Sequence, residues 1–116
     1  RARANSLLGV LGFNYISVLQ SGPVTTFVSH ATTSSITSIV FLGGFRVEVL
    51  PGPTVSTSTV VARLAAGPVG VAGERGAGRV FSWGDEWIQS NGEFTNVNSQ
   101  VPRFWANILG WLRHWR

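Results

Sequence analysis

The alternation of apolar and polar positions predicts a chain built mainly from short β-strands. Runs rich in Val, Ile, Thr and Phe are separated by clusters of Gly, Pro and Ser, as strands joined by turns require. The predicted strands cover residues 13–19, 24–28, 36–42, 45–50, 57–65, 68–72 and 79–83. We therefore expect a β-rich sheet with hairpin connections.

Two glycine-rich segments predict hairpin turns. The runs ITSIVFL and FRVEVL flank Gly43-Gly44, a pair that can adopt the positive φ values of a two-residue turn. The segment GERGAG (residues 73–78) joins the last two predicted strands. It lacks the GK[ST] ending of a phosphate-binding loop, and a strand follows it, so we interpret it as a hairpin turn.

Apolar residues at helical spacing predict a helix at each end of the chain. Near the N-terminus, Asn5-Ser6 is the expected cap of a short helix that stops at Gly12. Near the C-terminus, Ser99 is the expected cap and Pro102 fits a first turn. The apolar stripe of this second helix comprises Phe104, Trp105, Ile108, Leu109, Trp111, Leu112 and Trp115. The sequence thus predicts an α/β or α+β fold, with a short N-terminal helix and an amphipathic C-terminal helix packed on the sheet.

Composition favours one domain with a surface that associates easily. The 116 residues fit a single domain spanning 1–116. Charged residues make up 12% of the chain, against roughly 25% in an average soluble domain, which leaves few charges to resist association. The absence of cysteine excludes disulfides and thiolate chemistry, and the absence of methionine leads us to expect a processed or partial C-terminal part of a longer chain. No stretch reaches the roughly 20 apolar residues of a membrane span.

The basic residues are scattered rather than gathered into one surface. All nine are arginines, and the net charge is +4. Five lie towards the ends of the chain, at Arg1, Arg3, Arg103, Arg113 and Arg116. Because nucleic-acid binding needs phosphate-neutralising charge on one face, we expect no nucleic-acid partner.

The last predicted strand and the segment after it resemble a known family. GAGRVFSWGDEWI (residues 76–88), then a polar loop and an aromatic helix, resembles the C-terminal end of class I glutamine amidotransferase-like domains, which have a flavodoxin-like α/β fold. SHATTSSITSI (residues 29–39) is similar to the family's HP-x-T-x-G-I stretch. The resemblance covers only the second half of such a domain, so it implies a missing N-terminal half as a partner. Enzymatic members use a cysteine nucleophile, which this chain lacks, so the resemblance implies a non-catalytic type.

Three of the five acidic residues lie close together after the last predicted strand, at Asp85, Glu86 and Glu93. With Asn91 or Asn96 supplying a carbonyl oxygen, they form a candidate site for a hard cation such as Ca²⁺. The alternative is that Asp85 satisfies the loop backbone while Glu86 and Glu93 are solvated or pair with arginine. The spacing does not match an EF-hand loop.

The aromatic residues have two interpretations. Trp83 and Trp87 would share a face of an extended segment and could stack against a sugar. Alternatively, they lie in the core or at an interface, where aromatic side chains dominate. The candidate interface residues are Trp83, Trp87, Phe104, Trp105, Trp111 and Trp115.

His30 begins a polar loop over residues 30–35, and Ser29, Thr32 and Thr33 lie next to it in the sequence. Nucleophilic catalysis needs a base within hydrogen-bond reach and a third group that orients it, a geometry that adjacent loop residues rarely provide. We therefore expect no catalytic residues.

These features favour a non-enzymatic structural or interaction module without a cofactor. We expect it to assemble with other chains, as a homo-oligomer or with its missing half, in an extracellular filament or surface subunit. The first alternative is a cation- or carbohydrate-binding module that uses the loop from Asp85 to Asn96. The second is the C-terminal fragment of a hydrolase or amidotransferase-like protein whose catalytic residues lie upstream.

Overall fold

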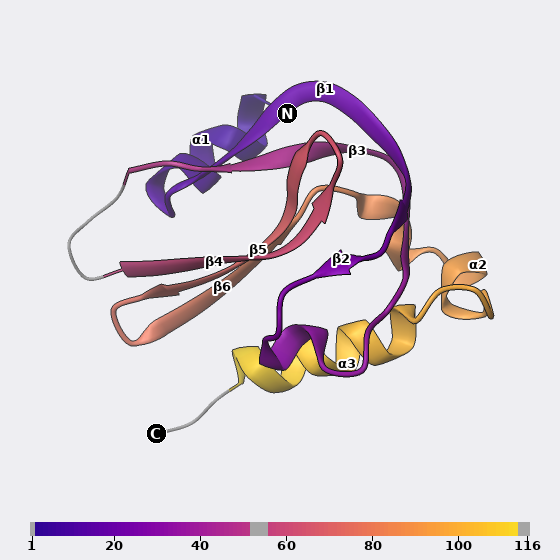
Figure 1. Cartoon of the computed structure of the whole chain (residues 1–116). Helices are drawn as coiled ribbons and strands as arrows, with labels where there is room; N and C mark the ends of the chain where they lie inside the picture. The colour runs from indigo at the N-terminus through magenta and orange to yellow at the C-terminus, as the bar shows by residue number, and fades with distance from the viewer. Residues whose placement is uncertain (1, 52–55, 114–116) are drawn as a thin grey trace.

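A computed structural model describes residues 2–51 and 56–113, which form an α+β fold with antiparallel sheets (Figure 1). The strands are β1 (Phe13–Val24), β2 (Thr26–Phe27), β3 (Ile39–Val49), β4 (Ser56–Leu64), β5 (Gly67–Arg75) and β6 (Gly78–Trp83). The helices are α1 (Ala2–Val10), α2 (Asn91–Phe94) and α3 (Val101–Leu112), with the 3-10 helices η1 (Ala31–Thr33) and η2 (Glu86–Gln89). The predicted β-rich fold with a helix near each end is confirmed.

The strands form two sheets that lie across one another. β1 pairs with β3, and a second sheet has the order β2-β4-β5-β6. Figure 1 shows the β1–β3 pair arching over the top of the view, β4 to β6 in the middle and α3 at the bottom. Among the described residues, no helix is long and apolar enough to cross a membrane.

The predicted hairpin at Gly43-Gly44 is wrong. β3 continues through both glycines and pairs along its length with β1, from Phe13 opposite Val49 to Val24 opposite Ile39. Gly43 has a φ of +110°, and the register with β1 shifts around it, so it forms a bulge and not a turn. Glycine adopts positive φ values easily, and this freedom permits a bulge inside a strand as readily as a hairpin turn.

The other predicted hairpin is confirmed. β5 and β6 pair from Gly70 opposite Trp83 to Arg75 opposite Gly78, which leaves residues 76–77 as the turn. A second tight turn, which the sequence analysis did not predict, joins Leu64 of β4 to Gly67 of β5.

Both predicted helix caps are wrong, because the side chains serve other segments. α1 begins at Ala2, and Asn5 lies inside it. The Asn5 side-chain oxygen accepts from the Tyr15 backbone N–H at 2.7 Å, and its amide donates to the Tyr15 carbonyl at 3.2 Å. Ser99 Oγ accepts from the Val40 N–H at 3.2 Å, and Gln100 takes the N-cap position of α3 without a side-chain cap bond.

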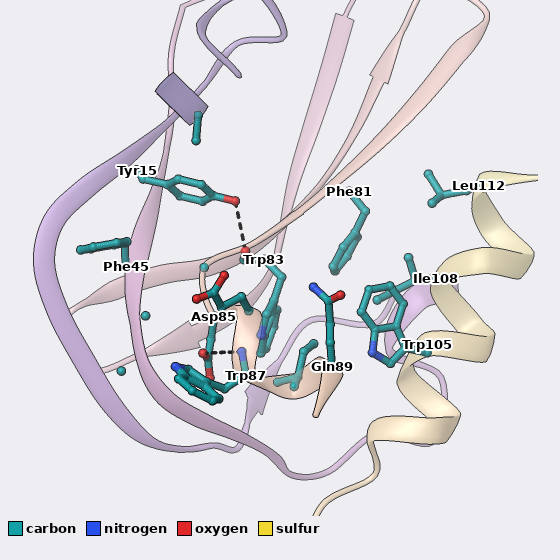
Figure 2. A pocket seen from close by; sticks show the side chains of 16 residues that line it. Tyr15, Phe45, Phe81, Trp83, Asp85, Trp87, Gln89, Trp105, Ile108 and Leu112 are labelled. Carbon is teal, nitrogen blue, oxygen red and sulfur yellow. Dashed lines mark hydrogen bonds between the residues drawn. The ribbon is translucent and has the colours of Figure 1, made fainter. Parts of the chain in front are cut away.

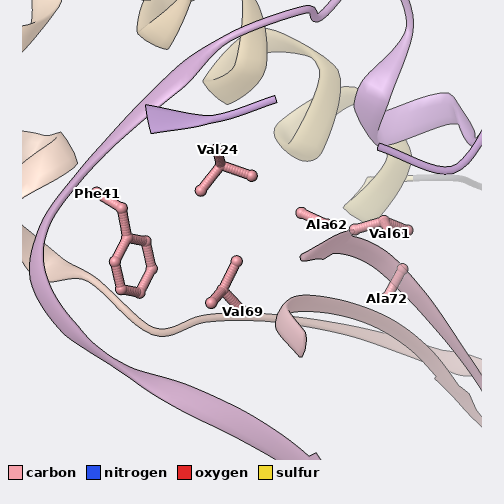
Figure 3. Packing of buried hydrophobic residues seen from close by; sticks show 6 residues of the cluster. All are labelled: Val24, Phe41, Val61, Ala62, Val69 and Ala72. Atoms are coloured by element: carbon pink, nitrogen blue, oxygen red, sulfur yellow. The ribbon is translucent and has the colours of Figure 1, made fainter. Parts of the chain in front are cut away.

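The buried core has three clusters that join the layers. One lies between the two sheets and comprises Val24, Phe41, Val61, Ala62, Val69 and Ala72 (Figure 3). The second joins α3 to the sheets and comprises Ile36, Ile39, Ile88, Val101, Phe104 and Ile108, with Phe81 and Trp83 packed against it. The third comprises Phe13, Val47 and Val71, with Leu8 and Leu11 beside it. The prediction that the C-terminal helix packs on the sheet is therefore confirmed.

The chain just after β6 meets the bulge of β3 backbone to backbone. The Phe45 N–H donates to the Gly84 carbonyl at 2.9 Å, and the Gly84 N–H donates to the Val69 carbonyl at 3.0 Å. A Cβ atom added at Gly44 would overlap the Gly84 backbone, and one added at Gly84 would overlap the Phe45 carbonyl. The two glycines are required because any side chain would force the sheets apart. We call this contact the glycine junction.

Gly84→Ala should lower the free energy of unfolding by about 3 kcal/mol, since the new methyl group meets rigid backbone and cannot be accommodated by a rotamer change. Urea unfolding measures the effect. Gly9→Ala is the matched control, because a Cβ there meets no atom within 4 Å and the helix should gain up to about 1 kcal/mol. Equal urea midpoints for Gly84→Ala and the unmodified chain would contradict the junction.

Candidate functional site

The bulge of β3, the end of β6, η2 and α3 enclose a groove of about 520 Å³ lined by aromatic rings (Figure 2). Ring-bearing residues from five elements line it, namely Tyr15, Phe45, Phe81, Trp83, Trp87 and Trp105. The rest of the lining comprises Ala4, Gly43, Gly44, Gly84, Asp85, Glu86, Ile88, Gln89, Ile108 and Leu112. We call this cavity the aromatic groove.

Trp83 and Trp87 have different roles. The Trp83 ring packs edge-on against Phe41 at 5.8 Å and Phe104 at 4.9 Å between centroids, and its carbonyl accepts from the Tyr15 hydroxyl at 3.2 Å. Trp87 lies on η2 and is 56% exposed. Trp83 therefore belongs mainly to the core, while Trp87 presents its ring to solvent at the groove.

Asp85 has the backbone-satisfying role that the sequence analysis gave as one of its two interpretations. It is only 2% exposed, and its Oδ2 accepts from the Leu42 N–H at 2.5 Å. Its Oδ1 accepts from the Trp87 N–H at 3.0 Å, which caps η2. The carboxylate thus holds β3 and η2 together, beside the glycine junction.

Glu86 and Glu93, the other two candidate cation ligands, do not share the role of Asp85. Glu86 is exposed at the rim of the aromatic groove. Glu93 lies on α2 and accepts from the Asn96 side-chain amide at 3.1 Å. Within residues 2–51 and 56–113, no three His, Asp or Glu side chains gather in a group that could hold a metal ion. The structure therefore does not bring Asp85, Glu86 and Glu93 together as one ligand set.

His30 is the cap of η1. Its Nδ1 accepts from the Thr32 N–H at 3.2 Å and lies 2.9 Å from Thr32 Oγ1, while Thr33 Oγ1 accepts from the His30 N–H at 3.1 Å. Burial lowers the pKa of His30 below 6.5, and the nearby positive charge of Arg79 acts in the same direction, against a smaller opposing effect of Glu74. A neutral imidazole suits the role of hydrogen-bond acceptor at this cap.

The aromatic residues of α3 divide between its two sides. Phe104 is fully buried, Trp105 is half-buried and lines the groove, and Trp111 packs edge-on against His30 at 5.2 Å. The Arg79 guanidinium lies 5.0 Å from the centre of the Trp111 ring and donates to the Trp111 carbonyl at 2.8 Å. Trp115 lies outside the described residues.

The groove itself was not predicted from the sequence. Tyr15 and Phe45 reach it only because β1 pairs with β3 and β3 bends at Gly43, two features that the predicted hairpin excluded. Gln89 and Leu112 were not singled out as site residues. In the sequence, the adjacent Gly43 and Gly44 were the one local signal that another backbone segment approaches β3 closely.

Comparisons with protein-family models, with curated proteins and with solved structures find no match for this chain.

Asp85→Ala should lower the free energy of unfolding by about 2–4 kcal/mol, because two backbone N–H groups lose their acceptor. Chemical unfolding followed by tryptophan fluorescence measures it. Glu86→Ala is the control at the adjacent exposed position and should change stability by no more than about 0.5 kcal/mol. Similar losses in the two variants would show that the buried carboxylate has no special role.

Proposed function

We propose that this chain is a non-enzymatic interaction module that assembles with other chains, in the first instance with copies of itself, outside the cell or at its surface. The observation that carries the proposal is the number of large apolar side chains left exposed. They are Leu7, Val10, Val18, Leu19, Val28, Leu42, Val49, Trp87, Phe94, Val97, Leu109 and Leu112. With charged residues at 12% of the chain, this surface has little to oppose association.

The polar side chains with the strongest case for chemistry support the same proposal. Asp85 is occupied by two backbone N–H groups, and His30 is occupied by the cap of η1. Each therefore has a structural role that accounts for its position. The resemblance to the second half of a glutamine amidotransferase-like domain adds a further partner to the proposal, the missing N-terminal half.

Sedimentation equilibrium of the purified chain should give a mass that rises with concentration above 12.5 kDa. Because apolar contacts would drive the association, added sulfate should strengthen it, whereas screening by salt would weaken an assembly held by exposed ion pairs. Negative-stain microscopy distinguishes closed oligomers from filaments. A mass that stays at the monomer value up to millimolar concentration refutes the proposal.

The aromatic groove supports a second candidate, a carbohydrate-binding module. The exposed ring of Trp87 offers an apolar face, and the polar side chains of Glu86 and Gln89 lie beside it along the same groove. Sugar sites combine a flat ring with a few polar groups in this way.

For this candidate, calorimetry with simple glycans, with and without Ca²⁺, should give heats that disappear in Trp87→Ala. Phe94→Ala is the control, since Phe94 is an exposed aromatic residue of α2 that does not line the groove. Binding that needs Ca²⁺ and is lost in Glu86→Gln would restore the cation interpretation of the acidic residues. No heat with any glycan, in either condition, would remove the candidate.

A further inference from the structure

Helix α3 has one broad apolar face, and the described residues cover only part of its width. Val101, Phe104 and Ile108 are buried against the sheets. Trp105, Leu109 and Leu112, at positions i, i+4 and i+7, form a second stripe, which we call the outer ridge. Leu109 is 57% exposed, and Leu112 is 38% exposed. The apolar face of an amphipathic helix is normally covered across its whole width.

The outer ridge borders the aromatic groove, because Trp105 and Leu112 belong to both. Figure 2 shows these two side chains projecting from α3 towards Gln89 and Phe81. The exposed charged residue that lines the groove is Glu86, which is acidic, in a chain whose net charge is +4. The surface beside the outer ridge therefore favours a partner that combines an apolar face with a positive charge.

The end of α3 itself carries that combination. Arg113 follows Leu112 directly, is exposed, and has no described residue hydrogen-bonded or ion-paired to its guanidinium. It lies four positions after Leu109, just as Trp105 lies four positions before it. Residues spaced by four lie on the same side of a helix, so Trp105, Leu109 and Arg113 form one line along α3.

We propose that the outer ridge docks onto the outer ridge of a second copy, with the two α3 helices antiparallel about a two-fold axis at Leu109. This inference rests on the proposed function and names its interface. A two-fold interface repeats each contact twice. With the axis at Leu109, Arg113 of each copy faces Trp105 of the other.

The predicted contacts have complementary chemistry. A guanidinium over an indole face is attracted by the ring, and Glu86 at the rim of the groove adds an opposite charge. The pair formed by Leu109 of each copy supplies apolar area at the centre, and Leu112 of each copy adds to it. An anionic lipid surface is disfavoured as the occupant, because it would bring negative charge against the exposed Glu86.

The experiment is sedimentation equilibrium of single-site variants of the full chain, with circular dichroism as a check of folding. Leu109→Glu places a charge on the axis and should abolish the dimer. Arg113→Glu and Glu86→Arg should each raise the dimer dissociation constant about tenfold or more, since each removes two symmetric contacts. The double variant Glu86→Arg/Arg113→Glu should regain most of the affinity.

Arg63→Glu is the matched control, because Arg63 is an exposed arginine of β4 and the charge change is the same. It should leave the dissociation constant unchanged. If the chain dimerises but Leu109→Glu and Arg113→Glu match the unmodified chain, the interface is overturned while the proposed function stands. If the chain is monomeric at every concentration, both are refuted. Co-sedimentation with phosphatidylglycerol vesicles that Leu109→Glu abolishes, in a chain that does not dimerise, would assign the ridge to a membrane surface instead.

Discussion

The glycine junction is the constraint on which the rest of the structure depends. Gly44 and Gly84 bring the middle of β3 against the chain that leaves β6, at a separation that no side chain would permit. Backbone hydrogen bonds from Phe45 and Gly84, and the Asp85 carboxylate on the Leu42 N–H, hold this contact. The two sheets meet there, and the same bend of β3 opens the aromatic groove between them and α3.

Much of the fold could be predicted from local patterns. The strands β4 to β6, the β5–β6 turn and the apolar stripe of α3 follow from alternation, turn residues and helical spacing within a few neighbouring positions. The path of β3 could not be predicted, because a glycine pair permits a turn and a bulge alike, and the choice depends on pairing with β1 about 25 residues away. Local chemistry left both conformations open, and the pairing with β1 decided between them.

The candidate site was likewise predictable only where it depends on local sequence. The role of Asp85 could be predicted as one of two alternatives, because it follows a strand and lies beside a glycine, where an aspartate often satisfies backbone groups. Its second donor, Leu42, was not, since 43 positions separate the two residues. The groove combines residues of β1, β3, β6, η2 and α3, so no single segment of the sequence contains all of its lining residues. Sites assembled from distant segments become visible only when strand pairing is known.

The contact between Asn5 and Tyr15 limits how such a chain can associate. The Asn5 side-chain amide presents one acceptor and one donor to the Tyr15 backbone, as the peptide group of a neighbouring strand would. A further strand cannot pair with β1 at that residue without displacing the amide, so the start of this sheet edge is closed to strand addition. At this residue, another copy must therefore associate through side-chain surfaces and not by extending the sheet.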